Sequence, residues 1–202
     1  MLTFDHIAIA CTDLAVASAA LSSQLGAPLQ PGGRHDRYGT HNALLGMGDL
    51  YLELIALDSA AAPTGHAAWF DLDRFTGPAR PANWICRTDD LSAAIAAAPV
   101  ATGPAVSLSR GDLKWQITVP QDSSLPLSGA MPTLIRWEPG TPHPTTRLSD
   151  SRCRLIRWEV SHPKADLLRD NLALRDPRVV FVTGAPGFCA TIDTPLGAKV
   201  LS

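Results

Sequence analysis

The sequence predicts an α+β fold built from repeated βαβββ units. Strand and helix patterns alternate in a fixed order along the chain, the same order begins again at Asn83, and a third copy follows from Arg154. Repeats of this size cannot bury one face of a sheet alone, so they must pack against one another or against a second chain.

The first unit shows each of these elements in turn. Residues 4–11 carry apolar side chains on both faces, which is typical of a strand that is covered on both sides. Asp13 stands where a helix N-cap belongs, Gly26 stands where a helix ends, and apolar residues recur at helical spacing between them. A further strand is expected within residues 31–39, and residues 41–57 hold two apolar runs that predict a β-hairpin.

The second unit repeats the order over residues 82–138. A strand pattern starts at Asn83, and Asp90 is placed to cap a short helix. Residues 106–119 predict another hairpin, and residues 133–138 supply the last strand of this unit.

The third copy occupies residues 152–202. It starts with a strand at residues 155–161, continues with a helix that has Pro163 in its first turn, and ends in short strands separated by Gly, Pro and Asp. Residues 58–81 and 139–151 are rich in Pro and small residues, so we expect them to be connections.

The charge balance excludes some classes of function. Seventeen basic residues face nineteen acidic ones, and no run of like charge forms a stripe that could neutralise phosphates, so nucleic acid is not an expected partner. Asp5 and Asp13 interrupt the apolar start, so it predicts neither a signal peptide nor a membrane span, and a cytoplasmic protein without a membrane partner is expected.

Two segments of the first unit resemble the paired signatures of the vicinal oxygen chelate (glyoxalase/bleomycin resistance/dioxygenase) superfamily. They are DHIAIACTDL on the first strand and DLYLELIAL on the last, and the segments GTHN and TLIRWEPGTPHP are similar to the glyoxalase-like domain branch. The resemblance implies curved mixed sheets around a cup-shaped cavity, in which His6 and Glu53 bind a divalent metal ion.

The resemblance also implies a division of the chain. Residues 1–138 would form one glyoxalase-like domain from the units 1–58 and 82–138. Residues 152–202 would then be a third, partnerless βαβββ-like unit, packed on this domain or on a second subunit. Because its apolar strands would be uncovered on a single chain, a homodimer is expected.

His6 and Glu53 are unusual residues even without the resemblance. Each is a lone ionisable residue inside an apolar strand, and burying an unpartnered carboxylate costs several kcal/mol. A divalent ion such as Zn, Mn, Fe, Co or Ni would satisfy both side chains. The alternative is a neutral histidine hydrogen-bonded to the glutamate without a metal.

The second unit departs from the superfamily pattern. When the two units are aligned by their helix caps, Asn83 takes the place of His6, and the place of Glu53 falls near Arg136 or Glu138. Asparagine is a poor metal ligand, so a four-ligand site is not expected. Glu138 would supply a second carboxylate, whereas Arg136 would pair with Glu53 or bind an anionic substrate.

The hairpin leaves two candidates for the residue beside Glu53. A turn of two or four residues places Asn42 there, and a turn of three residues places His41 there. We favour Asn42, whereas an inward His41 would complete a 2-His-1-carboxylate set with His6 and Glu53. The remaining histidines are expected to be solvated: His35, His66, His143 and His162.

The sequence therefore predicts a glyoxalase-like metal-dependent enzyme, a lyase, isomerase or dioxygenase, that acts on a small oxygen-rich molecule. Glu53 and His6 are the predicted catalytic residues, and Glu53 would move a proton. The alternative is a metal-free small-molecule binding or sequestering protein of the bleomycin-resistance type, with tryptophans around its cavity. The residues expected to contact the ligand are Asn42, His41, Trp84, Arg136 and Glu138.

Overall fold

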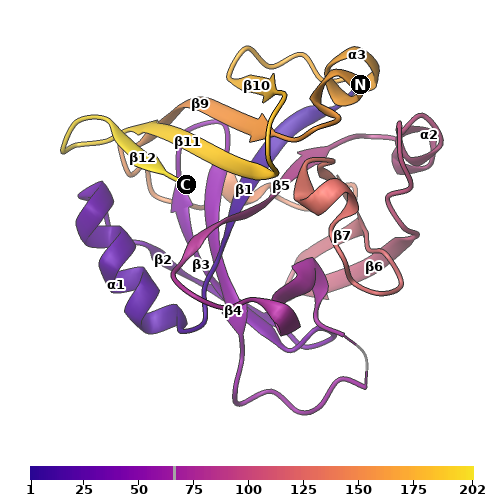
Figure 1. Cartoon of the computed structure of the whole chain (residues 1–202). Coiled ribbons are helices and arrows are strands. Elements are labelled where there is room, and N and C mark those ends of the chain that lie inside the picture. The colour runs from indigo at the N-terminus through magenta and orange to yellow at the C-terminus, as the bar shows by residue number, and fades with distance from the viewer. Residues whose placement is uncertain (66) are drawn as a thin grey trace.

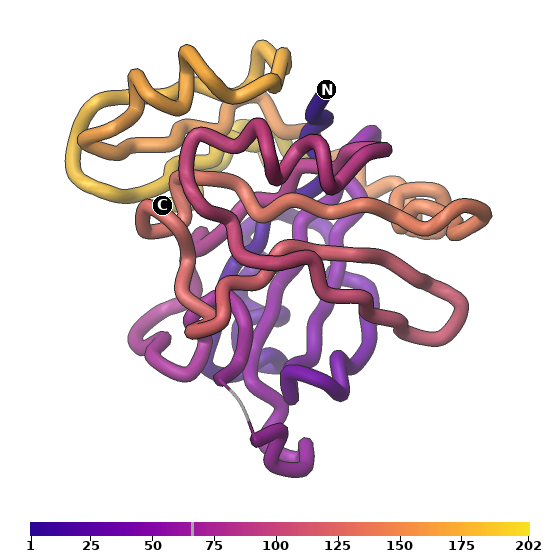
Figure 2. The backbone as a smooth tube through the Cα atoms, turned by 90° about the vertical axis from the view of Figure 1, so that its right-hand side faces the viewer, coloured from indigo at the N-terminus to yellow at the C-terminus, as the bar shows by residue number. Residues whose placement is uncertain are grey.

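The computed structural model describes residues 1–65 and 67–202. Eight strands form one sheet in the order β2-β3-β4-β1-β5-β8-β7-β6, and four form a second sheet in the order β10-β9-β11-β12. The larger sheet is strongly curved, and the smaller one lies across its outer side (Figures 1 and 2). The predicted α+β class with curved mixed sheets is confirmed.

The first unit has the predicted order. Asp13 accepts a hydrogen bond from the Val16 backbone N–H and caps the helix, and Gly26 ends it with a φ of 66° that favours glycine. The elements are β1 (Thr3–Ala10), α1 (Leu14–Leu25), β2 (Gln30–His35), β3 (Thr40–Gly46) and β4 (Tyr51–Leu57).

The second unit mirrors the first across the centre of the sheet. Strand β1 pairs with β5 in antiparallel fashion, and from there the strands run β4-β3-β2 on one side and β8-β7-β6 on the other. The elements of this half are η1 (Trp69–Arg74), β5 (Arg80–Arg87), α2 (Leu91–Ala96), β6 (Ala105–Arg110), β7 (Leu113–Thr118), η2 (Pro126–Gly129) and β8 (Thr133–Trp137).

The third unit has the same element order but pairs its strands differently. Strand β10 runs parallel to β9 and directly beside it, because the chain crosses over through α3, whereas β11 lies antiparallel on the other side of β9. The elements are η3 (Pro144–Thr146), β9 (Arg154–Ser161), α3 (Ala165–Asn171), β10 (Val179–Val182), β11 (Gly187–Asp193) and β12 (Lys199–Leu201).

Two clusters of buried residues lie on the two faces of the large sheet. On the outer face, Phe4 packs against Trp158 of the second sheet, with ring centroids 6.4 Å apart. On the inner face, Trp69 and Trp115 belong to a separate cluster that surrounds the concave side. His6 of β1 and Glu53 of β4 line a cavity together with these two tryptophans, so both lie on the concave side.

The apolar face of the third unit is buried within its own chain. Trp158, Val160 and Ile192 are fully covered and share one cluster with Phe4 and Trp84 of the large sheet. The uncovered face from which a homodimer was inferred is therefore not present in a single chain, and the dimer itself stays a prediction. In the described part of the chain, no helix has both the length and the apolar character needed to span a membrane.

Candidate functional site

His6 and Glu53 face each other on the concave side of the large sheet. They lie on the neighbouring parallel strands β1 and β4, and the His6 Nε2 atom is 3.6 Å from the Glu53 Oε2 atom. Both side chains are buried, with 5% and 6% of their surface exposed. The Tyr51 ring is stacked on the His6 imidazole with centroids 4.3 Å apart, which fixes the plane of the ring.

Asp5 holds His6 from behind. One carboxylate oxygen of Asp5 lies 2.6 Å from His6 Nδ1, and the other accepts hydrogen bonds from Trp137 Nε1 at 3.1 Å and from His143 Nε2 at 2.9 Å. Burial would raise the pKa of Asp5, but the hydrogen bonds from His143 and His6 outweigh it and lower that pKa well below its usual range. An ionised Asp5 keeps a proton on the Nδ1 atom of His6. The other ring nitrogen of His6, Nε2, faces Glu53.

The resting pair carries two opposite charges. Burial would lower the pKa of His6, but hydrogen bonds to Asp5 and Glu53 raise it to about 9. Burial would raise the pKa of Glu53, but the hydrogen bond and charge of His6 lower it to about 2. At neutral pH the site therefore contains an imidazolium and a carboxylate.

Asn42 completes the surroundings of Glu53. Its amide Nδ2 donates to Glu53 Oε1 at 2.5 Å, and its Oδ1 accepts from the Gly33 backbone N–H at 2.8 Å, which fixes the orientation of the amide. Four residues separate β3 and β4, so Asn42 lies on the face of Glu53, as expected for a turn of that length. His41 lies opposite Arg34 of β2 and is not among the residues that line the cavity.

Arg110 reaches this group from the other half of the sheet. It ends β6, and its guanidinium donates to Asn42 Oδ1 at 3.1 Å and lies 3.2 Å from His35 Nε2. Burial lowers the pKa of His35 to about 4, so its ring is neutral and its Nε2 atom accepts from Arg110. The His35 Nδ1 atom lies 3.0 Å from Thr40 Oγ1, which also accepts from Trp69 Nε1.

These side chains close a small cavity with aromatic walls. Its free volume is about 30 Å³, which is room for roughly one or two water molecules. Trp115 on β7 lines it, and the indole N–H of Trp115 is buried without a hydrogen-bond partner among the described residues. The apolar lining comes from Leu44, Tyr51, Trp69, Phe70, Trp115, Ile117, Ile135 and Trp137.

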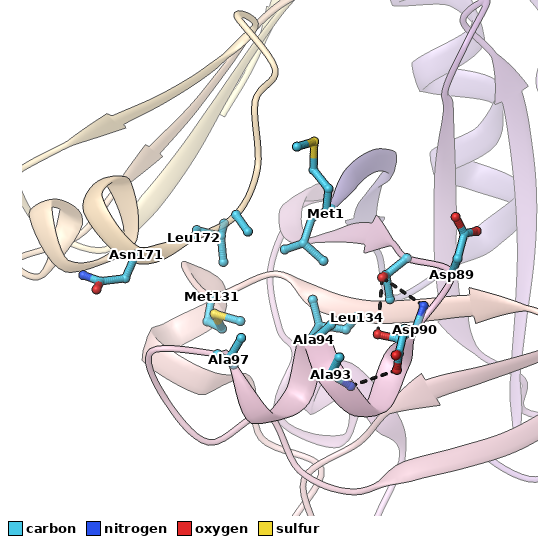
Figure 3. A pocket seen from close by; sticks show the side chains of 14 residues that line it. Met1, Asp89, Asp90, Ala93, Ala94, Ala97, Met131, Leu134, Asn171 and Leu172 are labelled. Carbon is cyan, nitrogen blue, oxygen red and sulfur yellow. Dashed lines mark hydrogen bonds between the residues drawn. The ribbon is translucent and has the colours of Figure 1, made fainter.

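A larger cavity of about 320 Å³ lies between α2, α3 and the start of β1 (Figure 3). Its walls are mainly alanine, leucine and methionine side chains, among them Ala94, Met131 and Leu172. Asp90 at its rim is occupied in capping α2 through the Ala93 N–H. Among the described residues that line this cavity, no acid and base form a pair like that of His6 and Glu53.

The residues of the small cavity do not form a resident metal centre. Within residues 1–65 and 67–202, no three side chains of His, Cys, Asp or Glu converge where they could hold one ion. His6 and Glu53 would be the two ligands, whereas catalytic zinc sites usually have three from the protein. The second unit contributes Arg110, Ile135 and Trp137 to the lining of the cavity, and none of these three side chains is a metal ligand.

Three other residues expected to contact the ligand, and Asn83 in the place of His6, do not line the small cavity. Asn83 binds Thr133 Oγ1 and the Trp84 backbone N–H with its amide. Trp84 is fully buried between the two sheets, where its indole donates to the Gly129 and Ala130 carbonyls, because odd and even positions of a strand face opposite sides. Arg136 and Glu138 are paired with each other at 3.5 Å outside the cavity, because Ile135 and Trp137 take the inward positions of β8.

The expectation that the remaining histidines are solvated is wrong for His35 and His162, which are buried, and His143 is half-buried against Asp5. His66 lies outside the described residues. Sequence reasoning missed Asp5, because alternation places it on the face opposite His6. A register shift in the pairing of β1 with β5 makes Asp5 an extra residue between Phe4 and His6, so its side chain can reach the His6 ring.

Comparisons with known proteins show the family of the chain. The sequence profile of the glyoxalase-like domain family matches residues 4–174. The chain belongs to this family. The match confirms the resemblance first recognised in the segments around His6 and Glu53. No curated protein matches the sequence.

Solved structures are similar in fold. A hypothetical protein from Staphylococcus aureus is 17% identical and has a TM-score of 0.58, and the match covers 96% of this chain and 82% of that one. Methylmalonyl-CoA epimerase from Mycobacterium tuberculosis is 22% identical with a TM-score of 0.45, covering 68% of this chain and 87% of that one. A hypothetical protein from Bacillus halodurans C-125 is 16% identical with a TM-score of 0.47, covering 67% and 93%.

Proposed function

We propose that this glyoxalase-like domain is an isomerase or lyase that transfers a proton on a small oxygen-rich molecule bound between His6 and Glu53. The observation that carries the proposal is the buried pair itself. A proton donor and a proton acceptor lie 3.6 Å apart at one cavity, and each is held from its far side, His6 by Asp5 and Glu53 by Asn42.

The reaction would begin when a ligand oxygen displaces Glu53 as the partner of His6. The His6 Nε2–H then donates to that oxygen, and the Glu53 carboxylate takes a proton from the adjacent carbon. The electron pair of the broken C–H bond moves to the oxygen, where the imidazolium stabilises the developing charge. His6 gives its proton to that oxygen and takes the proton of the hydroxyl group on the first carbon, and return of the proton from Glu53 to the neighbouring carbon completes an isomerisation.

The surroundings of Glu53 make it a stronger base when the ligand is bound. The pKa of Glu53 is low because His6 donates to it, and burial acts in the opposite direction. A ligand that takes over the His6 hydrogen bond leaves Glu53 buried with less stabilisation of its charge, so its pKa rises. The pair is thus a weak base before binding and a stronger one afterwards.

Solvent deuterium exchange tests this proposal. The chelator-treated protein is incubated in D2O with hydroxyacetone, dihydroxyacetone or pyruvate, and loss of the C–H signal is followed by proton NMR. We expect exchange that depends on the protein, is lost in Glu53→Gln, and is unchanged in Glu159→Gln, whose carboxylate lies on β9 and pairs with Arg157. Absence of protein-dependent exchange, or equal exchange in Glu53→Gln, would contradict the proposal.

Metal dependence is tested in the same assay. Adding Zn, Mn, Fe(II), Co or Ni in turn to the chelated protein is expected to leave the exchange rate unchanged, because His6 and Glu53 are too few ligands for a resident ion. Exchange that appears only with one of these metals and disappears in Glu53→Gln would replace the proposal with a metal-dependent one.

The aromatic lining favours one second candidate, a protein that sequesters a planar ligand without converting it. Trp69, Trp115 and Trp137 surround the cavity and offer large flat surfaces. Such a protein would show ligand-dependent quenching of tryptophan fluorescence with no C–H exchange in any of the ligands that bind.

A further inference from the structure

Arg110 is a half-buried cation whose partners in the described part of the chain are neutral. Its guanidinium contacts the Asn42 amide oxygen and the His35 ring, and the ion pairs formed by residues 1–65 and 67–202 do not include it. Arginine presents several donors in a planar fork that matches a carboxylate. A guanidinium that lines a cavity without an acidic partner is suited to an anionic ligand.

Trp115 adds a second donor to the same cavity. Its ring lines the cavity from β7, only 5% of its surface is exposed, and its indole N–H has no acceptor in the described structure. A buried indole N–H usually has a partner, because leaving it unpaired costs free energy. A ligand oxygen would supply the missing acceptor.

We infer that the ligand of this cavity is a small carboxylate, bound through Arg110 and Trp115, with the reacting carbon two bonds from the carboxylate carbon. This inference rests on the proposed function, because His6 and Glu53 act on the reacting carbon. The ligand class that fits is a short 2-oxo acid. Its 2-oxo oxygen would reach His6 and take up the electron pair when Glu53 removes a proton from the carbon on the far side of the 2-oxo carbon.

The spacing of the site limits the length of the ligand. One amide side chain, that of Asn42, joins Arg110 to Glu53, with Arg110 Nη1 at 3.1 Å from its oxygen and Glu53 Oε1 at 2.5 Å from its nitrogen. A ligand that contacts both residues must therefore place its carboxylate and its reacting carbon within one or two bonds of each other.

Gly33 allows Arg110 to take this position. A Cβ atom at Gly33 would lie 2.5 Å from Arg110 Cδ, so Gly33→Ala displaces the Arg110 side chain without removing its charge. This variant separates the position of the guanidinium from its presence.

Calorimetric titration tests the inference directly, with pyruvate and lactate as carboxylates and with pyruvamide and lactamide as neutral probes of the same shape. We expect saturable binding of the acids and no measurable binding of the amides. Arg110→Met should weaken binding of the acids by at least about tenfold, because a charged hydrogen-bond partner is lost, whereas Arg110→Lys should retain part of the affinity.

Further variants give matched controls. Gly33→Ala should weaken binding of the acids, and Trp115→Phe should weaken it less than Arg110→Met, because a single neutral donor is removed. Arg157→Met removes an arginine that is paired with Glu159 on the second sheet, so it should leave the affinity unchanged. Retained thermal unfolding temperatures show that each variant folds.

The outcomes separate the inference from the proposed function. No saturable binding of either acid up to about 10 mM, equal binding of the amides, or unchanged affinity in Arg110→Met overturns the carboxylate assignment. Binding of the acids through Arg110 without C–H exchange supports the carboxylate assignment and refutes the proton transfer. Exchange on hydroxyacetone without binding of the acids supports the proton transfer and refutes the carboxylate assignment.

Discussion

Raising the pH from 6.5 to about 9 is expected to destabilise the protein, because the folded chain keeps a proton on His6 that the unfolded chain loses. The pKa of a free histidine is 6.5, and that of the buried His6 is raised to about 9 by its hydrogen bonds to Asp5 and Glu53. The difference of about 2.5 units corresponds to about 3 kcal/mol. This stabilisation is fully present below pH 6.5 and is lost as the pH approaches 9.

Urea denaturation across this range measures the effect as the free energy of unfolding. The wild-type protein should lose about 1.4 kcal/mol per pH unit relative to His6→Gln, which lacks the titrating group. Cys11 and Cys86 also have raised pKa values, but their ordinary value is 9.0, so they act mainly at higher pH and in both proteins. Parallel curves for the two proteins, or a wild-type curve that is flat between pH 6.5 and 8, would refute the charged state assigned to His6.

Three further predictions concern the residues around the site and the ends of its elements. Asp5→Ala should lower the free energy of unfolding by about 3 to 5 kcal/mol, because the ring N–H groups of His6 and His143 lose their acceptor. A loss below about 1 kcal/mol in urea denaturation would contradict this. The pKa of His35 is lowered to about 4, so the free energy of unfolding should fall as the pH drops from 6.5 to 4. His35→Gln should reduce that fall when urea denaturation is measured at both pH values. Gly26→Ala should lower the thermal unfolding temperature more than Gly111→Ala. Both glycines have positive φ, but of the two only Gly26 would bring a Cβ atom close to another side chain, with Leu196 Cγ at 2.5 Å. Equal losses in the two variants would show that the contact with Leu196 is unimportant.

Local signals in the sequence were sufficient for much of the fold. Asp13 and Gly26 mark the ends of α1 because each satisfies a backbone requirement that depends only on neighbouring residues. The hairpin length also determines which side Asn42 faces, since side chains alternate along a strand. The strand pairing of the third unit could not be predicted in this way, because β10 and β11 both follow α3 and lie on opposite sides of β9, in an order that packing decides.

The sequence predicted the two central residues of the candidate site and missed three others, because only the first two interrupt a local pattern. His6 and Glu53 are conspicuous because each interrupts an apolar strand. Arg110 and Trp115 have no such signal, because a turn arginine and a strand tryptophan are ordinary, and the contact of Arg110 with Asn42 joins residues 68 positions apart. Asp5 was hidden by a bulge, which breaks the alternation that sequence patterns assume.

The charged state of His6 is the centre of this account, and nitrogen-15 NMR of its imidazole ring measures it most directly. In the chelator-treated protein, both ring nitrogens should remain protonated from neutral pH up to about 9, and one equivalent of Zn²⁺ should leave their shifts unchanged. An unprotonated Nε2 at pH 7, or a shift of Nε2 that saturates at one equivalent of Zn²⁺, would contradict the ion pair with Glu53 and favour a metal site instead.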